Sequence, residues 1–154
     1  MPRNQEVMPV PPERVWEVLS DPRSYGYWVI GSKKIRDWDP EWPAEGAKFH
    51  HTVGAGPIRV RDHSIVEASV PPQVLRLRVK ARPLGTFVVT LQMLPEGEGQ
   101  TRVVMDEVPA DRLTRLFFGP LAHLAVRARN FGSLGRLNDL AVGKGEALPE
   151  AASG

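Results

Sequence analysis

Four histidines, a set of carboxylates and scattered arginines are the residues of this chain that could do chemistry. No spacing of His, Asp and Glu matches a zinc or non-haem iron signature, and the chain has no cysteine to act as a thiolate ligand. His50 and His51 are adjacent on a predicted strand, so their side chains point to opposite faces and cannot share a metal. We therefore predict no metal site and no cofactor.

Alternation along the predicted strands sorts the polar residues between two faces. Asp62 and Ser64 fall on the same apolar face as Val66, and His51 falls on the same face as Phe49. A ligand cavity is a mostly apolar space with a few polar groups in its wall. The pattern therefore makes His51 and Asp62 candidates for contact with a ligand.

The long helix predicted near the C-terminus carries polar residues in its apolar stripe. At about 100° per residue, Arg127 and Asn130 fall within about 80° of Leu134, whereas Arg129 falls on the opposite side. This placement makes Arg127 and Asn130 candidates for ligand contact.

An arginine that faces a core is costly unless a carboxylate or a ligand meets it. Asp62 is the first candidate partner for Arg127, and Glu107 is the second because it can share a face with apolar neighbours. Two further interpretations stay open: Arg127 extends to water at the mouth of a cavity, or it binds an anionic group of the ligand.

Aromatic residues are the other candidates for a cavity wall. Trp28 and Phe87 are the two predicted to line it, although such residues more often pack a core. Trp38 and Trp42 lie in a turn-rich stretch that could form a rim or a lid, and an exposed pair of tryptophans would indicate binding.

The elements that must position these residues change character along the chain. Prolines 11 and 12 precede a predicted helix over 13–19, and a second short helix passes through Tyr25 and Trp28. Alternating strands joined by short turns follow, down to Val108, and indicate an antiparallel meander. Helical spacing returns over 111–142 with a break at Gly119-Pro120. The pattern predicts an α+β fold in which a curved antiparallel sheet wraps around the long C-terminal helix.

Length and composition narrow the classes of protein. The chain has 154 residues, of which 42% are hydrophobic and 25% are charged, with a net charge of +2. We predict one domain over residues 1–143 and a disordered tail over 144–154. No basic block indicates nucleic-acid binding, no apolar run is long enough for a membrane span, and the first residues lack the apolar stretch of a signal peptide. The absence of cysteine favours a cytoplasmic protein.

Several local landmarks follow this order of elements. They are Pro12–Trp16, Tyr25 with Trp28-Val29 and Gly31, Ile35–Asp37 with Asp39, Trp42-Pro43, Gly46 and His50-His51, and Arg129-Asn130 followed by Leu134, Leu137 and Leu140. With these landmarks the chain resembles the START-like helix-grip superfamily (SRPBCC), in particular its bacterial polyketide cyclase/dehydrase-like branch. The resemblance implies a ligand cavity under the long helix, and it brings no catalytic triad that could be assigned to positions here.

Three functions agree with these observations. The favoured hypothesis is a binder or carrier of a small, largely apolar molecule that is lipid-like or polycyclic. The alternative is a cyclase or dehydrase that uses His51, Asp62 and Arg127 as acid, base or anchor. The third is a protein-interaction module with Trp38 and Trp42 on an exposed rim. We expect a monomer or homodimer with a small apolar ligand as its partner.

Overall fold

The strands of the structure follow the alternation of apolar and polar residues in the sequence. The computed structural model describes residues 3–30, 32–55, 57–81 and 85–143. Its helices and strands are β1 (Arg3–Met8), α1 (Pro12–Leu19), the 3-10 helix η1 (Pro22–Ser24), α2 (Tyr25–Trp28), β2 (Ser32–Trp38), β3 (Lys48–Ala55), β4 (Ile58–Val70), β5 (Val74–Ala81), β6 (Gly85–Pro95), β7 (Thr101–Pro109), α3 (Arg112–Phe117) and α4 (Pro120–Ala141).

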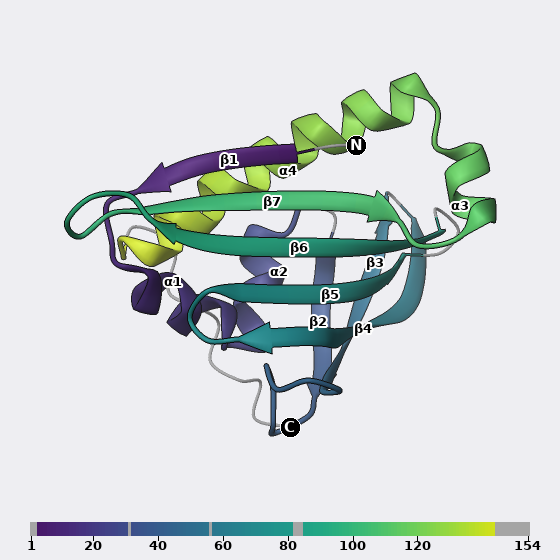
Figure 1. Cartoon of the computed structure of the whole chain (residues 1–154). Coiled ribbons are helices and arrows are strands. Elements are labelled where there is room, and N and C mark those ends of the chain that lie inside the picture. Colours follow the sequence, from purple (N-terminus) through teal and green to yellow (C-terminus); the bar gives the residue numbers. More distant parts are fainter. Residues whose placement is uncertain (1–2, 31, 56, 82–84, 144–154) are drawn as a thin grey trace.

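The strands form one antiparallel sheet in the order β1-β7-β6-β5-β4-β3-β2. From β2 to β7 each strand pairs with the next along the chain, and β1 closes the other edge by pairing with β7. Register shifts interrupt the β2–β3 and β4–β5 ladders, and such bulges increase the local twist and bend of a sheet. Figure 1 shows the result: β2 and β3 pass behind β5 and β6, so that the sheet has a concave inner face.

The inner face carries the core. On β6 the side chains of Phe87, Val89, Leu91 and Met93 are buried and alternate with half-buried neighbours, as the sequence predicts. Val89, Leu91 and Met93 pack in one cluster with residues of α1, α2 and the second half of α4, such as Leu134, whereas the Phe87 ring lies 5.9 Å from that of Phe118. Burying each large aliphatic side chain stabilises the fold by roughly 1.5–3 kcal/mol, which is what holds the helices to the sheet.

The two halves of α4 have different surroundings. All of its buried residues lie at or after Asn130, and they include Leu134 and Leu137. The first half runs along β1 and, with α3, extends past the end of the sheet (Figure 1). The predicted α+β architecture, with a curved antiparallel sheet and a long C-terminal helix, is confirmed. The predicted tail, residues 144–154, lies outside the described residues.

Candidate functional site

Polar side chains on β3 and β4 form the first part of the candidate site. Pairing across the sheet places His51 opposite Asp62, and Ser64 opposite Phe49. On the other side of β4, Ser64 is opposite Val79, and Val79 is opposite Phe87 of β6. A serine and a histidine therefore lie in a wall that is otherwise mainly apolar, with the predicted residue Phe87 in the same cross-strand row as Ser64.

The imidazole of His51 contacts the hydroxyl of Ser64 inside this wall. The His51 Nε2 and Ser64 Oγ atoms are 3.2 Å apart, and the two residues are only 3% and 1% exposed. Burial lowers the pKa of His51 to about 4, and this effect outweighs the opposing influence of the nearby Asp62 carboxylate. His51 is therefore neutral at physiological pH, and the pair carries no charge.

Asp62 is buried beside this pair, with 3% of its surface exposed. Its Oδ1 atom accepts a hydrogen bond from the backbone N–H of His63 at 3.2 Å. The Arg36 guanidinium donates to the backbone carbonyls of His51 and Asp62, at 3.4 and 3.3 Å. The structure thus brings His51, Asp62 and Ser64 together. Arg36 connects the backbones of the two strands that carry them.

A second polar cluster connects β7 to α4. Arg129 donates hydrogen bonds to both carboxylate oxygens of Glu107, to Oε1 at 2.7 Å, and the Asn130 amide donates to Oε2 at 2.9 Å. The Glu107 side chain is 5% exposed and that of Arg129 is 31% exposed. Because a buried carboxylate needs such donors, this cluster fixes the position of the helix against the sheet.

The ion pair expected first for Arg127 is not found, and the structure agrees with the other interpretation, in which Arg127 extends to water at the edge of a cavity. Arg127 is exposed, and it makes no ion pair with Asp62 or Glu107 in the described part of the chain. The basic residue that meets a carboxylate is Arg129, which the sequence assigned to the opposite side of the helix. The buried side is centred near Leu137, so that Arg127 and Arg129 both fall about 80° from its centre, on either edge.

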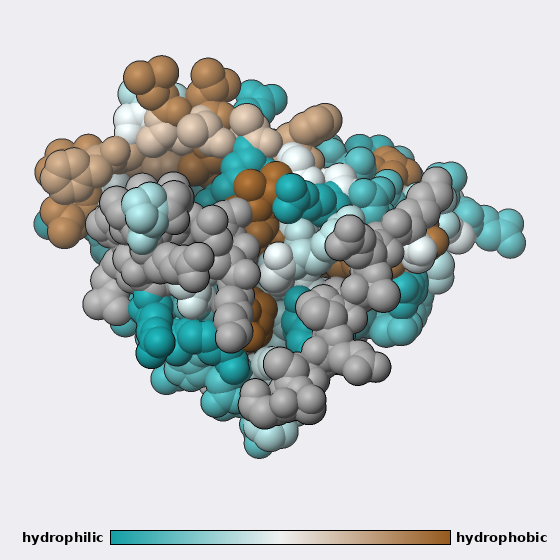
Figure 2. Space-filling model, turned by 180° about the vertical axis from the view of Figure 1, so that it is seen from behind, coloured by the Kyte–Doolittle hydropathy of each residue, from teal (hydrophilic) through white to brown (hydrophobic). Residues whose placement is uncertain are grey.

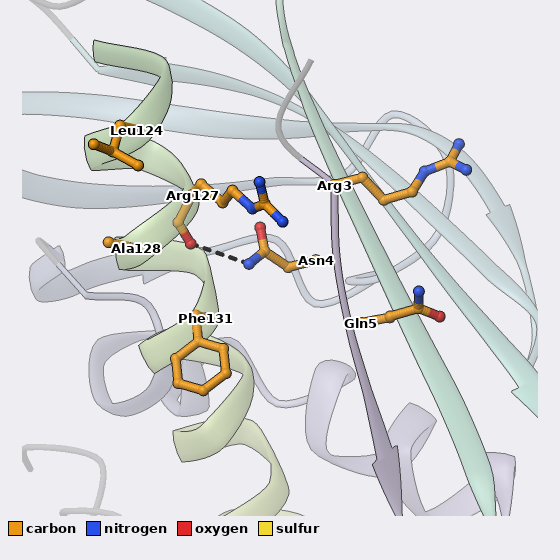
Figure 3. A pocket seen from close by; sticks show the side chains of 7 residues that line it. All are labelled: Arg3, Asn4, Gln5, Leu124, Arg127, Ala128 and Phe131. Carbon is orange, nitrogen blue, oxygen red and sulfur yellow. Dashed lines mark hydrogen bonds between the residues drawn. The ribbon is translucent and has the colours of Figure 1, made fainter. Parts of the chain in front are cut away.

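Arg127 instead lines an open pocket between β1 and α4. The pocket has a volume of about 470 Å³ and is lined by Arg3, Asn4, Gln5, Leu124, Arg127, Ala128 and Phe131. Figure 3 shows Asn4 and Arg127 pointing toward one another across it, and the Asn4 amide donates a 3.0 Å hydrogen bond to the Arg127 carbonyl. The Oδ1 atom of Asn4 is buried and has no hydrogen-bond partner among the described residues. We call this space the edge pocket.

The aromatic residues lie deeper than a rim or lid would. Trp42 is buried, and its Nε1 donates to the Leu19 carbonyl at 3.1 Å, so Trp38 and Trp42 do not form the exposed pair that would indicate binding. Trp28 is 1% exposed and its ring lies 5.1 Å from that of Tyr25. The Trp28 Nε1 atom is buried without a hydrogen-bond acceptor in the described part of the protein. A donor left in this way can bind a polar group of a ligand.

The sequence missed some members of both clusters. Ser64 was placed on the inner face by its alternation but was not singled out, because a serine on an apolar face has no chemical signature of its own. Glu107 was only a second choice, since β7 is apolar on both sides at Val103 and Val104. The only signal in the sequence for the contact between Glu107 and Asn130 is the position of Asn130 around the long helix, on its apolar side.

The described residues contain neither a cluster of metal ligands nor a membrane-spanning helix. Among the described residues, no three His, Asp or Glu side chains come close enough together to hold a metal ion. None of the described helices combines the length and the apolar character needed to cross a bilayer.

Solved structures with the same arrangement define the class of fold. A protein of Arthrobacter aurescens superposes with a TM-score of 0.72 at 14% identity, over 99% of this chain and 91% of that one. A Mesorhizobium loti protein gives 0.67 at 17% identity, over 94% and 98%. The protein Ara h 8.0201 gives 0.66 at 11% identity, over 92% and 96%. With the curved sheet and long helix, these likenesses define a helix-grip fold.

The family follows from the sequence itself. Residues 3–142 match the family described as polyketide cyclase / dehydrase and lipid transport. The chain belongs to this family, as the landmarks in its sequence predicted. No curated protein matches the chain closely enough in sequence to count as a relative.

Proposed function

We propose that this protein binds and carries a small, largely apolar molecule against the inner face of its sheet. The family joins cyclases and dehydrases with lipid transport, and each of these activities requires a site for a largely apolar molecule. The fold supports the proposal because it sets a concave apolar sheet against a helix. The ligand would contact His51 and Ser64 as its polar anchor, with Phe87 and Trp28 in the apolar wall.

One observation carries the proposal: the His51–Ser64 pair is polar, buried and neutral. A neutral pair can hydrogen-bond to a carbonyl or hydroxyl group of a ligand without the cost of burying a charge. The Ser64 hydroxyl has one donor and two acceptor sites, and His51 occupies one of them. The free Nε1 donor of Trp28 supports a second polar contact.

The pKa of His51 favours binding over catalysis. A general base works best when its pKa lies near the working pH, because it must be both deprotonated and basic. Burial lowers the pKa of His51 to about 4, so that the imidazole is a weak base at neutral pH. Arg127, which the enzyme hypothesis joined to His51 and Asp62, lines the edge pocket instead.

Adjacent histidines offer a matched test. His50 and His51 are neighbours on β3 with side chains on opposite faces, and only His51 is buried. We expect the purified protein to bind a fluorescent apolar probe that carries a carbonyl group, with His51→Leu weakening the affinity about tenfold and His50→Leu leaving it unchanged. Native mass spectrometry of the same samples would reveal any molecule that co-purifies. Equal affinities for the two variants would show that His51 does not contact the ligand.

The contact of Ser64 with His51 also favours a second candidate, a cyclase or dehydrase. A hydroxyl within hydrogen-bonding distance of an imidazole is an arrangement that proton transfer requires. For this candidate, a polyketide-like substrate incubated with the protein would lose water or gain a ring, as detected by mass spectrometry. Turnover that His51→Gln removes and His50→Gln leaves intact would establish the enzyme and replace the carrier.

A further inference from the structure

An apolar surface on α3 and α4 has no partner among the described residues. It consists of six large side chains that are between 62% and 84% exposed: Leu113, Leu116, Phe117, Leu121, Leu124 and Phe131. Figure 2 shows hydrophobic residues gathered over these two helices, along one end and one upper edge of the molecule. An exposed apolar patch of this size on a folded protein indicates an interaction site. We call it the α3–α4 surface.

The fold holds this surface in place. Asp111 caps α3 by accepting a 2.7 Å hydrogen bond from the Thr114 N–H, and the Thr114 hydroxyl accepts one from the Thr86 N–H at 3.1 Å. Gly85 leaves the room that Thr114 needs, since a Cβ atom there would lie 2.3 Å from the Thr114 Oγ1. Thr114 is buried while Leu113 faces outward, so the exposure of the apolar side chains follows from how α3 is anchored.

On α4 the exposed apolar residues form a stripe. Leu121, Leu124, Ala128 and Phe131 are spaced by three or four positions, which places them on one side of the helix within about 80°. The buried side, centred near Leu137, is almost opposite to this stripe. The helix therefore has two apolar faces, and only one of them packs on the protein.

The charged side chains within this surface are arginines, and the carboxylate next to it in the sequence is Asp111, the cap of α3. From position 112 to 138 the sequence contains five arginines and no aspartate or glutamate. Three of them, Arg112, Arg115 and Arg127, are exposed and form no ion pair with any described residue. Every exposed polar side chain between positions 112 and 131 is one of these three arginines.

We propose that the α3–α4 surface docks onto the interface of an anionic lipid bilayer. Its leucines and phenylalanines would enter the boundary between headgroups and acyl chains, while the arginines contact lipid phosphates, as in amphipathic segments that lie in a membrane surface. The surface does not depend on which molecule the inner face carries.

The charges and the polar groups distinguish this occupant from others. In a symmetric dimer the same surface meets itself, so that three arginines, Arg112, Arg115 and Arg127, would face like charges with only Asp111 at the border to offset them. A specific protein partner would have to supply acceptors for Arg112, Arg115 and Arg127, because these arginines are the exposed polar side chains of the surface and they only donate. A lipid surface needs only apolar side chains and cations.

Sedimentation with vesicles tests the proposal on the full chain. Vesicles of phosphatidylcholine and phosphatidylglycerol in equal parts should bind the protein, whereas vesicles of phosphatidylcholine alone should bind it at least about tenfold more weakly. Raised salt should weaken the binding to anionic vesicles, because it screens the arginines. Equal binding to the two kinds of vesicle, or binding to neither, would overturn the proposal.

Variants divide the apolar from the charged contribution. Leu116→Glu with Leu121→Glu should abolish vesicle binding, and Arg112→Gln with Arg115→Gln should weaken it about fivefold for each arginine removed. Matched controls on the sheet, Val70→Glu and Arg61→Gln, are exposed as well and should bind as the unmodified protein does. Thermal unfolding should be unchanged in all four, because every substituted side chain is exposed.

Two measurements keep this proposal apart from its rivals. If the unmodified chain is a dimer in sedimentation equilibrium and Leu116→Glu with Leu121→Glu makes it a monomer, the surface belongs to a second copy and the lipid proposal is wrong. Binding of the apolar probe by the inner face should be unaffected in these variants. A protein that binds the probe but no vesicle would refute only the docking, and one that binds vesicles but no probe would refute only the carrier.

Discussion

Glu107 and His51 both lie on the inner face of the sheet, but their surroundings satisfy them to different degrees. The Glu107 carboxylate receives hydrogen bonds from Arg129 and Asn130, which cover both of its oxygens. His51 contacts the hydroxyl of Ser64 and the backbone of His63, and it stays neutral. A buried charge must be saturated by the protein itself, whereas a neutral pair can keep hydrogen-bonding capacity for a ligand. The charged cluster is therefore suited to structure and the neutral one to binding.

The largest effect should come from breaking the charged cluster. Arg129→Met leaves the buried Glu107 carboxylate without its cationic partner, which should lower the free energy of unfolding by about 3 kcal/mol. Arg127→Met, two residues away on the same helix, removes only an exposed arginine and should change it by less than about 0.5 kcal/mol. Denaturant midpoints of the two variants measure the contrast.

A double variant checks the cause. Glu107→Gln together with Arg129→Met removes the stranded charge, so it should recover much of the stability that Arg129→Met loses. Equal midpoints for Arg127→Met and Arg129→Met, with no recovery in the double variant, would show that the ion pair does not hold α4 to the sheet.

The burial of neutral His51 should appear in the pH dependence of the free energy of unfolding. Since burial lowers the pKa of His51 to about 4, the unfolded chain, with a value near 6.5, binds more protons between these two values. The stability that His51 contributes is thus present above about pH 6.5 and is lost as the pH falls toward 4, by an amount on the order of 3 kcal/mol. Unfolding should be followed across this window in the unmodified protein and in His51→Leu.

His50→Leu is the matched control for this titration. His63 also has its pKa lowered, chiefly by burial, so part of the slope belongs to it and should persist in both variants. If His51→Leu and the unmodified protein lose stability equally between pH 6.5 and 4, His51 is not kept neutral by its surroundings.

The strands of this protein could be predicted from sequence, because a buried face with a period of two leaves a clear signal. Phe87, Leu91 and Met93 alternate without exception, and each is buried as expected. The same alternation placed His51 and Asp62 correctly on the inner face. It could not show that Ser64 contacts His51, because that contact depends on the register between β3 and β4.

The long helix could be located but not oriented from sequence. Its two apolar faces are nearly opposite, one buried around Leu137 and one exposed through Leu121 and Phe131. Leu134 belongs to the buried face and Phe131 to the exposed one. Treating both as one buried face shifts the predicted centre of that face toward Arg127. The sequence does indicate this second face, because apolar residues on two opposite sides of a helix cannot all pack against the same sheet.

Ser64→Ala should have an intermediate effect. Loss of the hydroxyl removes the hydrogen bond to the buried His51 ring, which should cost about 1 kcal/mol of stability. Ser69→Ala on the same strand, where the residue is half-buried, should cost less and is the control. Chemical denaturation measures both. A cost for Ser64→Ala no larger than that for Ser69→Ala would mean that the contact contributes nothing, and the proposed anchor would lose its partner.

The smallest effect concerns Glu6, a carboxylate of β1 that lacks the donors that Glu107 has. Its Oε2 atom is buried with no hydrogen-bond partner among the described residues, and burial followed by the charge of Asp139 raises its pKa. The folded protein therefore holds the Glu6 proton more tightly than the unfolded chain does. The group is least unfavourable at low pH, and it lowers stability as the pH rises above its unfolded value of about 4.3.

Glu6→Gln should accordingly stabilise the protein at pH 7 by about 0.5 kcal/mol or less, since solvent screens a half-buried group and its repulsion from Asp139. The gain should vanish near pH 4, where Glu6 in the unmodified protein is protonated and resembles glutamine. Gln5→Glu is a useful control, because it adds a carboxylate at the neighbouring exposed position of the same strand and should not produce this pH-dependent gain. If Glu6→Gln destabilises the protein at pH 7, the Glu6 carboxylate accepts a hydrogen bond in the folded protein. Glu6 and Glu107 would then not differ in how well their oxygens are satisfied by donors.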